Sequence, residues 1–250
     1  MTNARIALIT GASRGIGSAT AALAATRGYA VCVNFREQRE AAERLAASII
    51  SAGGRAVAIQ ADVADEAQVV RLFKECDAAL GPVTALVNNA GILAQHARVD
   101  ALDAARISRV LATNVTGAFL CAREAIKRMS TRYGGAGGAI VNVSSIAAKL
   151  GSPGEYVDYA ASKGALDAFT TGLSREVAAE GIRVNAVRAG FTYTDIHASG
   201  GEPGRVDRLA PGVPMQRGGT PNEVARAILW LLSDEASYST GAFLDVSGGK

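Results

Sequence analysis

The stretch IALITGASRGIG at residues 6–17 determines the fold of this chain. Its first residues form a short apolar run that is typical of a buried strand, and glycines follow at positions 11, 15 and 17. The Ala-rich sequence from Ile16 to Ala25 then has the pattern of a helix. Strand, glycine turn and helix let the backbone approach a pyrophosphate at the positive end of the helix dipole. The stretch therefore predicts a dinucleotide site, although a glycine-rich turn without a ligand has the same pattern.

Apolar runs alternate with helical patterns along the whole chain. The strand-like segments are 5–10, 30–35, 55–60, 83–88, 138–143, 182–187 and 242–246. The helix-like segments lie near 15–27, 37–52, 66–80, 101–111, 113–131, 157–179 and 221–232. The alternation predicts an α/β fold, a single doubly wound Rossmann-type domain over residues 1–250 with helices on both faces of a parallel sheet.

The composition excludes several classes of protein. No run of eighteen apolar residues is present, so we expect no membrane span, and the N-terminus lacks the pattern of a signal peptide. The three cysteines are widely spaced and form no CxxC pair, so neither a disulfide framework nor a metal site is expected. A net charge of +3 is mild and dispersed, which argues against nucleic-acid binding. We expect a cytoplasmic protein.

The most informative pair of residues is Tyr159 and Lys163, in the sequence YAASK. Four residues correspond to one helical turn, so the phenol and the ammonium group share one helix face. A nearby ammonium group favours the phenolate and lowers the pKa of a tyrosine. A tyrosine with such a pKa can exchange a proton with an alcohol or a carbonyl. Two residues on a solvated helix face would show the same spacing, so the other motifs of the chain must decide whether the pair is catalytic.

Together, these motifs resemble those of the short-chain dehydrogenase/reductase family over the whole chain. The matching elements, in the family's order, are the glycine motif at 10–17, Asp62-Val63, NNAG at 88–91, Asn114, Ser144-Ser145, YAASK at 159–163 and Arg188-Ala189-Gly190 with Thr194. The resemblance implies a sheet of seven strands in the order 3-2-1-4-5-6-7. It also implies a nicotinamide cofactor and hydride transfer between that cofactor and a carbonyl or alcohol.

The cofactor-binding residues are carried over from the family's motifs. Asp62 and the backbone of Val63 are implied to bind the adenine, and Thr194 the carboxamide. The full expected set is Gly11, Ser13, Arg14, Gly15, Ile16, Gly17, Arg36, Asp62, Val63, Asn88, Ala90, Gly91, Tyr159, Lys163, Gly190, Thr192 and Thr194. The family's usual proline before Gly190 is replaced by Ala189, which removes a stiffening residue from that loop.

The second strand predicts NADP(H) as the cofactor. An acid at its end would bind a free ribose 2′-hydroxyl, but Phe35 stands there and Arg36 follows. Arg14 precedes the second glycine of the motif. Two guanidinium groups suit a 2′-phosphate, and NADP-preferring members of the family carry basic residues at these places. Solvated surface arginines are the alternative.

Four residues are expected to be catalytic: Asn114, Ser145, Tyr159 and Lys163. Tyr159 is the proton donor, and the resemblance implies that Lys163 lowers its pKa and binds the nicotinamide ribose. A serine polarises the carbonyl, and Ser145 fits the family's spacing to the tyrosine better than Ser144. Asn114 interrupts a helical pattern, where asparagine is unfavourable. In the family this residue holds a water of the proton relay, while a buried structural asparagine is the alternative.

Residues 188–220 show no clear periodicity and carry many glycines and prolines. In the family this region folds over the substrate, so a lid is expected, with a disordered insertion as the alternative. Apolar residues that would pack such a lid are Phe191, Tyr193, Leu209 and Met215. His96 and His197 are possible substrate contacts, although most lone histidines are not. Glu155 and Asp158 are interpreted as solvated loop charges.

The expected function is that of a carbonyl reductase or alcohol dehydrogenase. A 3-oxoacyl-[acyl-carrier-protein] reductase, a sugar dehydrogenase and a non-catalytic NADP-binding protein remain as alternatives. A carrier protein would need a basic patch beside the cleft, for which the candidates are Arg123, Lys127, Arg128 and Arg132. An ordinary solvated helix face explains these four residues equally well. The sequence does not select the substrate.

A homotetramer is the expected assembly. Phe119, Leu166, Phe169 and Leu173 lie on the helices that also carry catalytic residues. Family members pair these two helices across a two-fold axis, and a second axis often joins the C-terminal strands. Two such interfaces give D₂ symmetry. The alternative is that these apolar residues face only their own core.

Overall fold

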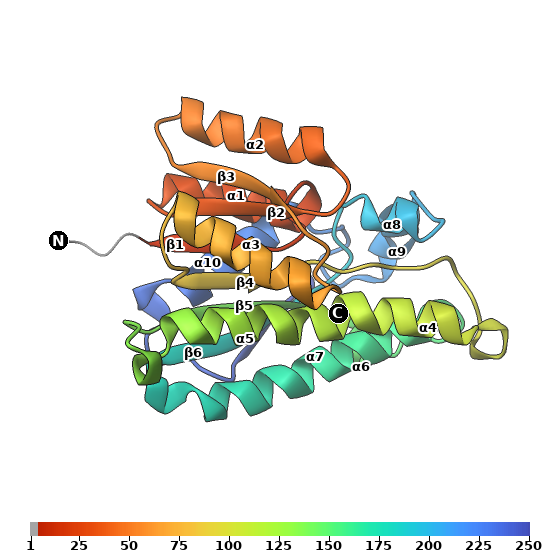
Figure 1. Cartoon of the computed structure of the whole chain (residues 1–250). Helices are drawn as coiled ribbons and strands as arrows, with labels where there is room; N and C mark the ends of the chain where they lie inside the picture. The colour runs from red at the N-terminus through yellow and green to blue at the C-terminus, as the bar shows by residue number, and fades with distance from the viewer. Residues whose placement is uncertain (1–4) are drawn as a thin grey trace.

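The computed structural model describes residues 5–250, so the first four residues of the predicted domain lie outside the described part. Seven strands form one parallel sheet in the order β3-β2-β1-β4-β5-β6-β7, which confirms the order implied by the resemblance (Figure 1). The strands are β1 (Ile6–Ile9), β2 (Ala30–Phe35), β3 (Ala56–Gln60), β4 (Ala85–Asn88), β5 (Gly138–Ser145), β6 (Ile182–Ala189) and β7 (Phe243–Val246).

The helices between the strands cover both faces of the sheet. The long ones are α1 (Gly15–Thr26), α2 (Arg39–Ser51), α3 (Glu66–Ala79), α4 (Ala104–Leu111), α5 (Gly117–Met129), α7 (Val157–Glu176) and α10 (Pro221–Leu232). The short ones are α6 (Ala147–Leu150), α8 (Ile196–Ser199) and α9 (Arg205–Leu209). The predicted doubly wound α/β domain is therefore confirmed.

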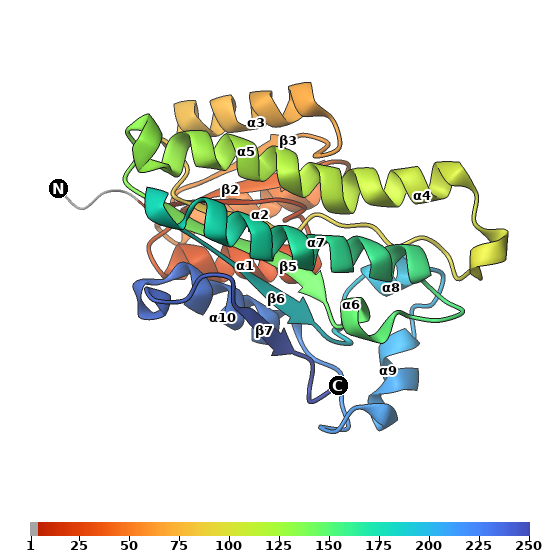
Figure 2. The ribbon, with the colours of Figure 1, turned by 90° about the horizontal axis from the view of Figure 1, so that it is seen from below.

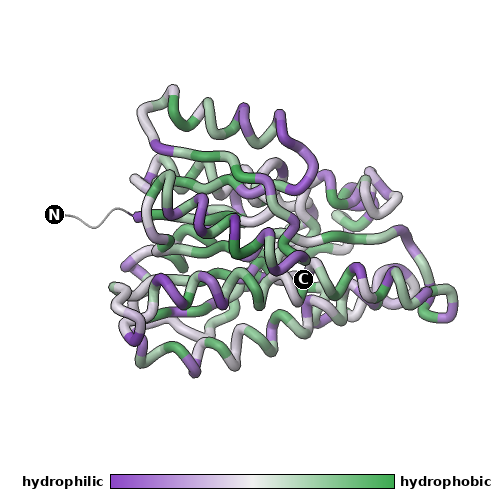
Figure 3. Tube along the Cα trace, in the orientation of Figure 1, coloured by the Kyte–Doolittle hydropathy of each residue, from purple (hydrophilic) through white to green (hydrophobic). Residues whose placement is uncertain are grey.

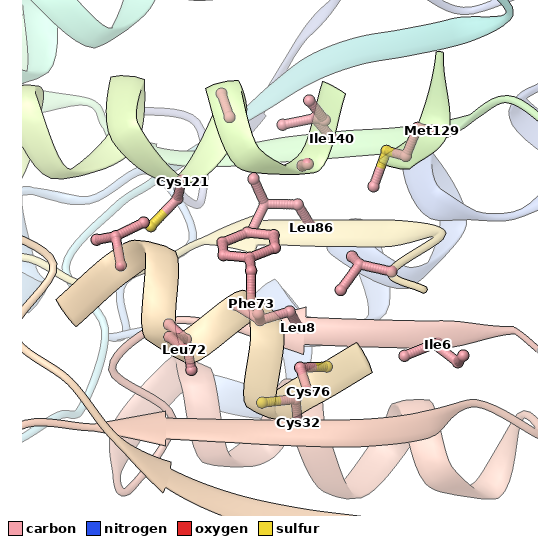
Figure 4. Packing of buried hydrophobic residues seen from close by; sticks show 14 of the residues in the cluster. Ile6, Leu8, Cys32, Leu72, Phe73, Cys76, Leu86, Cys121, Met129 and Ile140 are labelled. Atoms are coloured by element: carbon pink, nitrogen blue, oxygen red, sulfur yellow. The ribbon is translucent and has the colours of Figure 1, made fainter. Parts of the chain in front are cut away.

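Two hydrophobic cores fill the two layers between helices and sheet. One core lies under α3, α5 and α7, where Phe73 packs against Leu8 and Leu86 (Figure 4). The other lies under α1, α2 and α10. Hydropathy follows the same layers, since apolar segments concentrate in the central strands (Figure 3). The three cysteines are buried free thiols, and all of them belong to the core of Figure 4.

The topology places a crevice at the carboxyl ends of the strands. The strand order reverses between β1 and β4, and the chain leaves these two neighbours toward opposite faces of the sheet. Ligands of open parallel sheets bind at such a switch point. In Figure 2 the strand arrows point toward the side on which α8 and α9 lie. These two helices belong to the segment after β6, at the position expected for a lid.

The structure departs from the predicted elements most clearly in three places. First, β5 and β6 each continue two residues beyond the predicted ends. Second, residues 112–116 form a π-helical turn between α4 and α5. Third, the segment after β6 contains α8 and α9 and joins Thr192 to Gly219 by a parallel bridge, so it is an ordered structure. Among the described residues, no helix combines the length and the apolar character that crossing a bilayer requires.

Candidate active site

One cavity of about 500 Å³ lies at the carboxyl ends of the strands. Its wall is formed by the glycine loop after β1, the ends of β2 through β6, the first turns of α7 and the segment that contains α8 and α9. Most of the predicted site residues line it: Gly11, Ser13, Arg14, Gly15, Ile16, Arg36, Asp62, Val63, Ala90, Gly91, Ser145, Tyr159, Lys163, Gly190, Thr192 and Thr194. The fold thus brings the predicted cofactor-binding residues and most of the predicted catalytic residues into one cavity.

The glycine loop has the geometry that a dinucleotide requires. Gly11 and Gly15 have φ values of +60° and +59°, in the left-handed region that favours glycine. Gly17 is packed so tightly that a Cβ atom there would lie 2.5 Å from the Asn89 amide nitrogen. The first turn of α1 has neither a side-chain cap nor an acidic residue, so its backbone N–H groups remain available to an anion. These features fit a bound pyrophosphate.

Three polar residues hold this loop, and the sequence analysis missed all of them. The Asn34 Oδ1 accepts a hydrogen bond from the Gly11 backbone at 3.2 Å, while its amide donates to backbone oxygens of β3 and of Ala61. Asn89 donates to the carbonyls of Thr10 and Gly11 at 2.8 and 3.0 Å. The Thr10 hydroxyl accepts from the backbone of Asn89 and Ala90, both at 2.9 Å.

The prediction that Asn88 contacts the cofactor is not supported, because Asn88 is not among the cavity-lining residues. Its amide donates to the Asn142 Oδ1 at 2.9 Å and to the Ala118 carbonyl at 3.2 Å. Asn88 is the last residue of β4, and its side chain therefore points into the layer below α5. Alternation along a strand places Asn89 on the other side, toward the loop and the cavity. Gly17 also lies behind the wall, where it lets α1 pack against the loop.

Tyr159 and Ser145 form the centre of the site. Ser145 ends β5, and its hydroxyl accepts from the Ala147 backbone at 3.1 Å. Tyr159 lies in the first turn of α7. Burial raises the pKa of Tyr159 to about 12, while a hydrogen bond with Ser145 and the charge of Arg205 act in the opposite direction. The phenol is therefore a proton donor at neutral pH.

Lys163 lies beside Tyr159 without lowering its pKa. Its Nζ is 5.6 Å from the centre of the Tyr159 ring and donates to the Val143 carbonyl at 2.7 Å. Burial lowers the pKa of Lys163 itself to about 8, partly offset by Asp167. The pKa of Tyr159 is thus raised, whereas the sequence predicted that it would be lowered. The loss of hydration destabilises the phenolate by more than the Ser145 hydrogen bond and the charge of Arg205 stabilise it.

The two candidate serines differ in where they point. The Ser144 hydroxyl donates to Asp167 at 2.6 Å and is almost completely buried. The partners of Ser145 leave it beside Tyr159. Neighbouring residues of a strand point to opposite faces, so only one of the two can meet the tyrosine. The geometry supports the choice of Ser145.

Asn114 lies in the π-helical turn between α4 and α5. Its Oδ1 accepts from the Ile92 backbone at 2.8 Å, and its amide donates to the Ile92 carbonyl at 3.1 Å and the Ser162 hydroxyl at 3.0 Å. A Cβ atom at Gly91 would lie 3.5 Å from the Asn114 Oδ1 and 3.6 Å from the Lys163 Nζ. Asn114 is therefore close to Lys163, behind the cavity wall. Single π-turns often occur at functional sites.

The adenosine end of the cavity carries both arginines of the NADP prediction, but Arg36 is not a free cation. It forms an ion pair with Glu37, and its Nη1 lies 3.8 Å from the Asp62 carboxylate. Arg14 is exposed at the start of α1. Phe35, at the position of the acid in NAD-preferring relatives, is buried in the core. A 2′-phosphate at this end would compete with Glu37 for Arg36.

The segment 188–220 covers the substrate end of the cavity. Phe191 and Leu209 line it, whereas Tyr193 and Met215 are exposed, so only two of the four predicted lid residues face the site. His197 also lines the cavity. His96 does not, and it packs against the ring of Tyr156 with its Nε2 3.2 Å from Glu202.

Two acidic residues interpreted as solvated charges are ion-paired. Asp158 is buried and binds Arg106 of α4 in a bidentate pair, with distances of 2.8 and 3.2 Å. Glu155 pairs with Arg205 and Arg208 of α9 and lines the cavity. The interpretation was wrong for both, because their arginine partners lie about fifty residues away in the sequence and gave no local signal.

Comparisons with known proteins identify the family of this chain. A family model described as enoyl-(acyl carrier protein) reductase matches residues 11–250. The oxidoreductase YgfF of Escherichia coli K12 is 64% identical over 98% of this chain and 99% of its own length. A cis-4-hydroxycyclohexanecarboxylate dehydrogenase of Sinomonas cyclohexanicum is 41% identical, and a 3-oxoacyl-[acyl-carrier-protein] reductase of a Synechocystis species is 38% identical. Each of these two matches covers 98% of this chain and 96% of the relative. The chain belongs to the short-chain dehydrogenase/reductase family and is an oxidoreductase that acts on CH–OH groups.

Proposed function

We propose that this protein is an NADP(H)-dependent carbonyl reductase or alcohol dehydrogenase for a small-molecule substrate. The observation that carries the proposal is the meeting of Ser145, Tyr159 and Lys163 in the same cavity as the glycine loop. A carbonyl group held there has a hydroxyl and a phenol at its oxygen, and the loop at the other end fits a dinucleotide. The cofactor would supply the hydride for reduction, or accept it for oxidation.

The chain's own residues would handle the proton. Tyr159 donates it to the carbonyl oxygen, and its raised pKa keeps the phenol protonated until the oxygen acquires charge. Ser145 donates a second hydrogen bond to the same oxygen and stabilises that developing charge. Lys163 holds a positive charge next to the phenol, and Asn114 fixes the loop at Ile92 beside it. Phe191 and Leu209 of the segment 188–220 form the apolar part of the wall beside these groups.

NADP(H) is supported by Arg14 and Arg36 at the adenosine end and by the absence of an acid at Phe35. The 2′-phosphate would replace Glu37 as the partner of Arg36, and the loss of this ion pair would offset part of the binding free energy. We therefore propose a preference for NADP(H) that is moderate, with contacts from Asp62 and Val63 on the adenine side. Gly190, Thr192 and Thr194 would contact the nicotinamide end.

The alternatives differ in substrate class. A 3-oxoacyl-[acyl-carrier-protein] reductase would need an exposed basic patch near the cavity. Arg123 and Lys127 pair with Glu66 and Glu124, and Arg128 binds Asp77 and Glu124. These residues lie toward the C-terminal end of α5, which is the end remote from α8 and α9 (Figure 1). This position supports the solvated-face interpretation over carrier docking, while a sugar dehydrogenase remains compatible with the site.

The test is oxidation of NADPH by the purified protein in the presence of a panel of ketones, aldehydes, sugars and 3-oxoacyl thioesters, with the reverse reaction tested on the matching alcohols. The Tyr159→Phe variant is the control, because it retains the ring and removes the proton donor. We expect turnover to fall by at least about 10²-fold while NADPH still binds. Turnover near that of the wild type in this variant would remove Tyr159 from its role. A protein that binds NADPH and turns over no compound would support the non-catalytic alternative.

Two further features are proposed with this function. We propose a homotetramer, on the exposed apolar residues of α5 and α7 and the open edge of β7. We also propose a cytoplasmic location, in keeping with the three reduced, buried cysteines.

A further inference from the structure

His197 carries a hydrogen-bond acceptor that the protein itself does not satisfy. The residue is in α8 and lines the cavity. Its Nε2 lies 3.0 Å from the Thr192 carbonyl oxygen, and a carbonyl can only accept, so Nε2 carries the proton. In the neutral ring, Nδ1 is then an acceptor. This nitrogen is buried and has no hydrogen-bond partner among residues 5–250.

The surroundings keep His197 neutral. Burial lowers the pKa of His197, and the hydrogen bond to the Thr192 carbonyl offsets part of this effect. The charge of Arg205 lowers the pKa further, while Glu202 acts in the opposite direction. The imidazole therefore presents a lone pair at neutral pH rather than a second N–H group. A buried acceptor without a donor costs free energy, so a ligand that supplies the donor gains from the match.

Arg205 supplies donors on the same wall. Its side chain is 8% exposed and lies between two rings, with its Cζ 4.8 Å from the centre of Tyr156 and 5.8 Å from the centre of Phe191. Its closest approach to Glu155, at 2.5 Å, and to Glu202, at 3.6 Å, is through Nη1 in both cases. In neither approach does Nη1 have the geometry of a hydrogen bond, so this buried donor has no hydrogen-bond partner among residues 5–250. Backbone hydrogen bonds from Glu202 to His197 and from Arg205 to Glu202 hold the two residues in one unit.

The charge of this wall favours a neutral ligand group. Arg205 and Arg208 are balanced by Glu155 and Glu202, so the cluster has no net charge to attract a carboxylate. A carboxylate would also place a lone pair against the Nδ1 lone pair of His197. A hydroxyl group is different, because it donates one hydrogen bond and accepts others.

We propose that His197 and Arg205 form a hydroxyl-binding subsite, and that the physiological substrate carries a hydroxyl group in addition to the carbonyl or alcohol that reacts. The hydroxyl donates to the His197 Nδ1 and accepts from the Arg205 guanidinium group. This inference rests on the proposed function, since it narrows the substrate class of the same cavity. It selects hydroxyketones and polyols over simple ketones.

The chain permits a substitution that removes only the acceptor. Counted from Cβ, Nδ1 is two bonds away and Nε2 is three. Glutamine places its amide three bonds from Cβ, so His197→Gln keeps a donor for the Thr192 carbonyl and removes the Nδ1 acceptor. Asparagine places an amide oxygen two bonds from Cβ, so His197→Asn keeps an acceptor near the position of Nδ1. His96→Gln is the matched control, because it makes the same change at the other histidine of the chain, which does not line the cavity.

The experiment compares pairs of ketones in which a hydroxyl group of one is replaced by a methyl group in the other, with the hydroxyl at increasing distance from the carbonyl. Binding of each ketone to the complex of enzyme and NADP⁺ is measured by calorimetry, which needs no turnover. We expect the best hydroxyketone to bind the wild type at least about tenfold more tightly than its methyl partner. His197→Gln should remove this difference, and His197→Asn should retain part of it. The Kd for NADPH and the binding of the methyl partners should be unchanged in both variants and in His96→Gln.

Three results would overturn the proposal. One is a wild type that binds both members of every pair equally. Another is an equal loss for hydroxylated and methylated ketones in His197→Gln. The third is a weaker Kd for NADPH in His197→Gln, which would assign Nδ1 to the carboxamide of the cofactor. Failure of the proposed function is distinguishable, since it appears as an absence of NADPH oxidation with every compound while the binding comparison can still be made.

Discussion

Lys163 is an ammonium group that the fold buries almost completely, and this burial has a cost. Its pKa is lowered to about 8 because the charged form loses its hydration, and among residues 5–250 its direct hydrogen-bond partner is the Val143 carbonyl. A residue that lowers stability and lies beside the proton donor is typical of an active site. Lys163→Met should therefore stabilise the cofactor-free protein near pH 7 by about 1–3 kcal/mol, while activity is lost. Calorimetric melting should show a higher Tm by about 2–4 °C for each kcal/mol.

The sign of the pH dependence follows from the lowered pKa. The unfolded chain keeps Lys163 protonated up to about pH 10.4, whereas the folded protein releases this proton from about pH 8 upward. The cost of burial is thus complete below pH 8 and disappears as the pH rises toward the unfolded value. The Tm advantage of Lys163→Met should shrink when melting is repeated at about pH 9.5. An advantage that is equal at both pH values would contradict a lowered pKa, and Lys74→Met on the exposed face of α3 serves as the control.

Ser144 and Ser145 provide a test between neighbouring residues. Ser145→Ala removes a hydrogen bond to the reacting oxygen and should lower kcat/KM by about 10²–10³-fold. Ser144→Ala removes the bond to Asp167, so it should lower the Tm while kcat/KM stays within about tenfold of the wild type. Steady-state kinetics and melting of the two variants decide the matter. Equal losses of kcat/KM would reject the assignment of Ser145.

Arg36 tests the cofactor preference. Removal of a charge-assisted contact costs about 1.5–3 kcal/mol, so Arg36→Ala should raise the Kd of NADPH by at least about tenfold and leave the Kd of NADH unchanged. Glu37→Gln should have the opposite effect on NADPH, because it frees Arg36 from its ion pair. Arg39→Ala is the control, since Arg39 pairs with Glu43 and does not line the cavity. Tighter binding of NADH than of NADPH by the wild type would refute the preference.

At the scale of single elements, the hydrophobic pattern predicted where strands and helices lie but not how they end. Strand β2 has the predicted bounds, because apolar residues fill all of it except the buried Asn34. Strand β5 was predicted too short, since its last two residues are polar: Ser145 belongs to the site, and Ser144 donates to Asp167. Strand β6 was predicted too short for a related reason, since its next-to-last residue is Arg188, which pairs with Asp167 and Asp245. Polar residues at the end of a strand interrupt the apolar pattern from which the strand is predicted, so the predicted strand ends too early.

Other features were beyond sequence reasoning because they depend on distant partners. Helices α8 and α9 have four and five residues, too few for a helical period to be recognised. The only sequence signal for the π-turn at residues 112–116 was Asn114, a residue that is unfavourable inside a helix. Asn88 and Asn89 have identical chemistry, and only their opposite directions along the chain distinguish a core residue from one that holds the glycine loop.

The position of α7 depends on a buried ion pair at its first turn. Asp158 and Arg106 join α7 to α4, and Arg106 also donates to the Gln95 carbonyl at 2.7 Å. Asp158→Ala would leave the guanidinium group buried without its partner and should lower the free energy of unfolding by about 3–5 kcal/mol. Glu43→Ala breaks an exposed pair on α2 and should cost less than about 1 kcal/mol. Urea unfolding of both variants measures the difference. A cost for Asp158→Ala as small as that for Glu43→Ala would show that the pair does not hold α7.

At the scale of the whole molecule, α5 and α7 lie side by side on the outside of the sheet and leave an apolar groove between them (Figure 2). Phe119 is 49% exposed and stacks on Phe169 with ring centres 3.8 Å apart. The expectation that Leu166 faces outward was wrong, because it is buried, whereas Leu173 is mostly buried but lines the groove. The groove is completed by small residues of α7, Ala165, Ala168 and Gly172, over which a second helix pair can approach closely.

A second exposed surface is the edge strand β7, where Leu244 is 37% exposed and the strand has a neighbour only on the β6 side. An unpaired edge with an apolar residue is a common site of association. Two different surfaces, each pairing with its own copy across a two-fold axis, generate a tetramer with D₂ symmetry. The groove lies on a helical face and the edge at the end of the sheet, so they are two different surfaces.

Light scattering at micromolar concentration should therefore give a mass of about four times the 25.6 kDa of the chain. Phe119→Glu places a charge in the apolar groove and should convert the tetramer to dimers that are held by β7 alone. Ile50→Glu makes the same change at an equally exposed residue of α2 and should leave the mass unaltered. A wild-type mass near that of one chain would reject both interfaces. If the wild type is a dimer and Phe119→Glu converts it to monomers, the groove is the interface and the strand edge is not. If Phe119→Glu leaves that dimer intact, the strand edge is the interface and the groove is not.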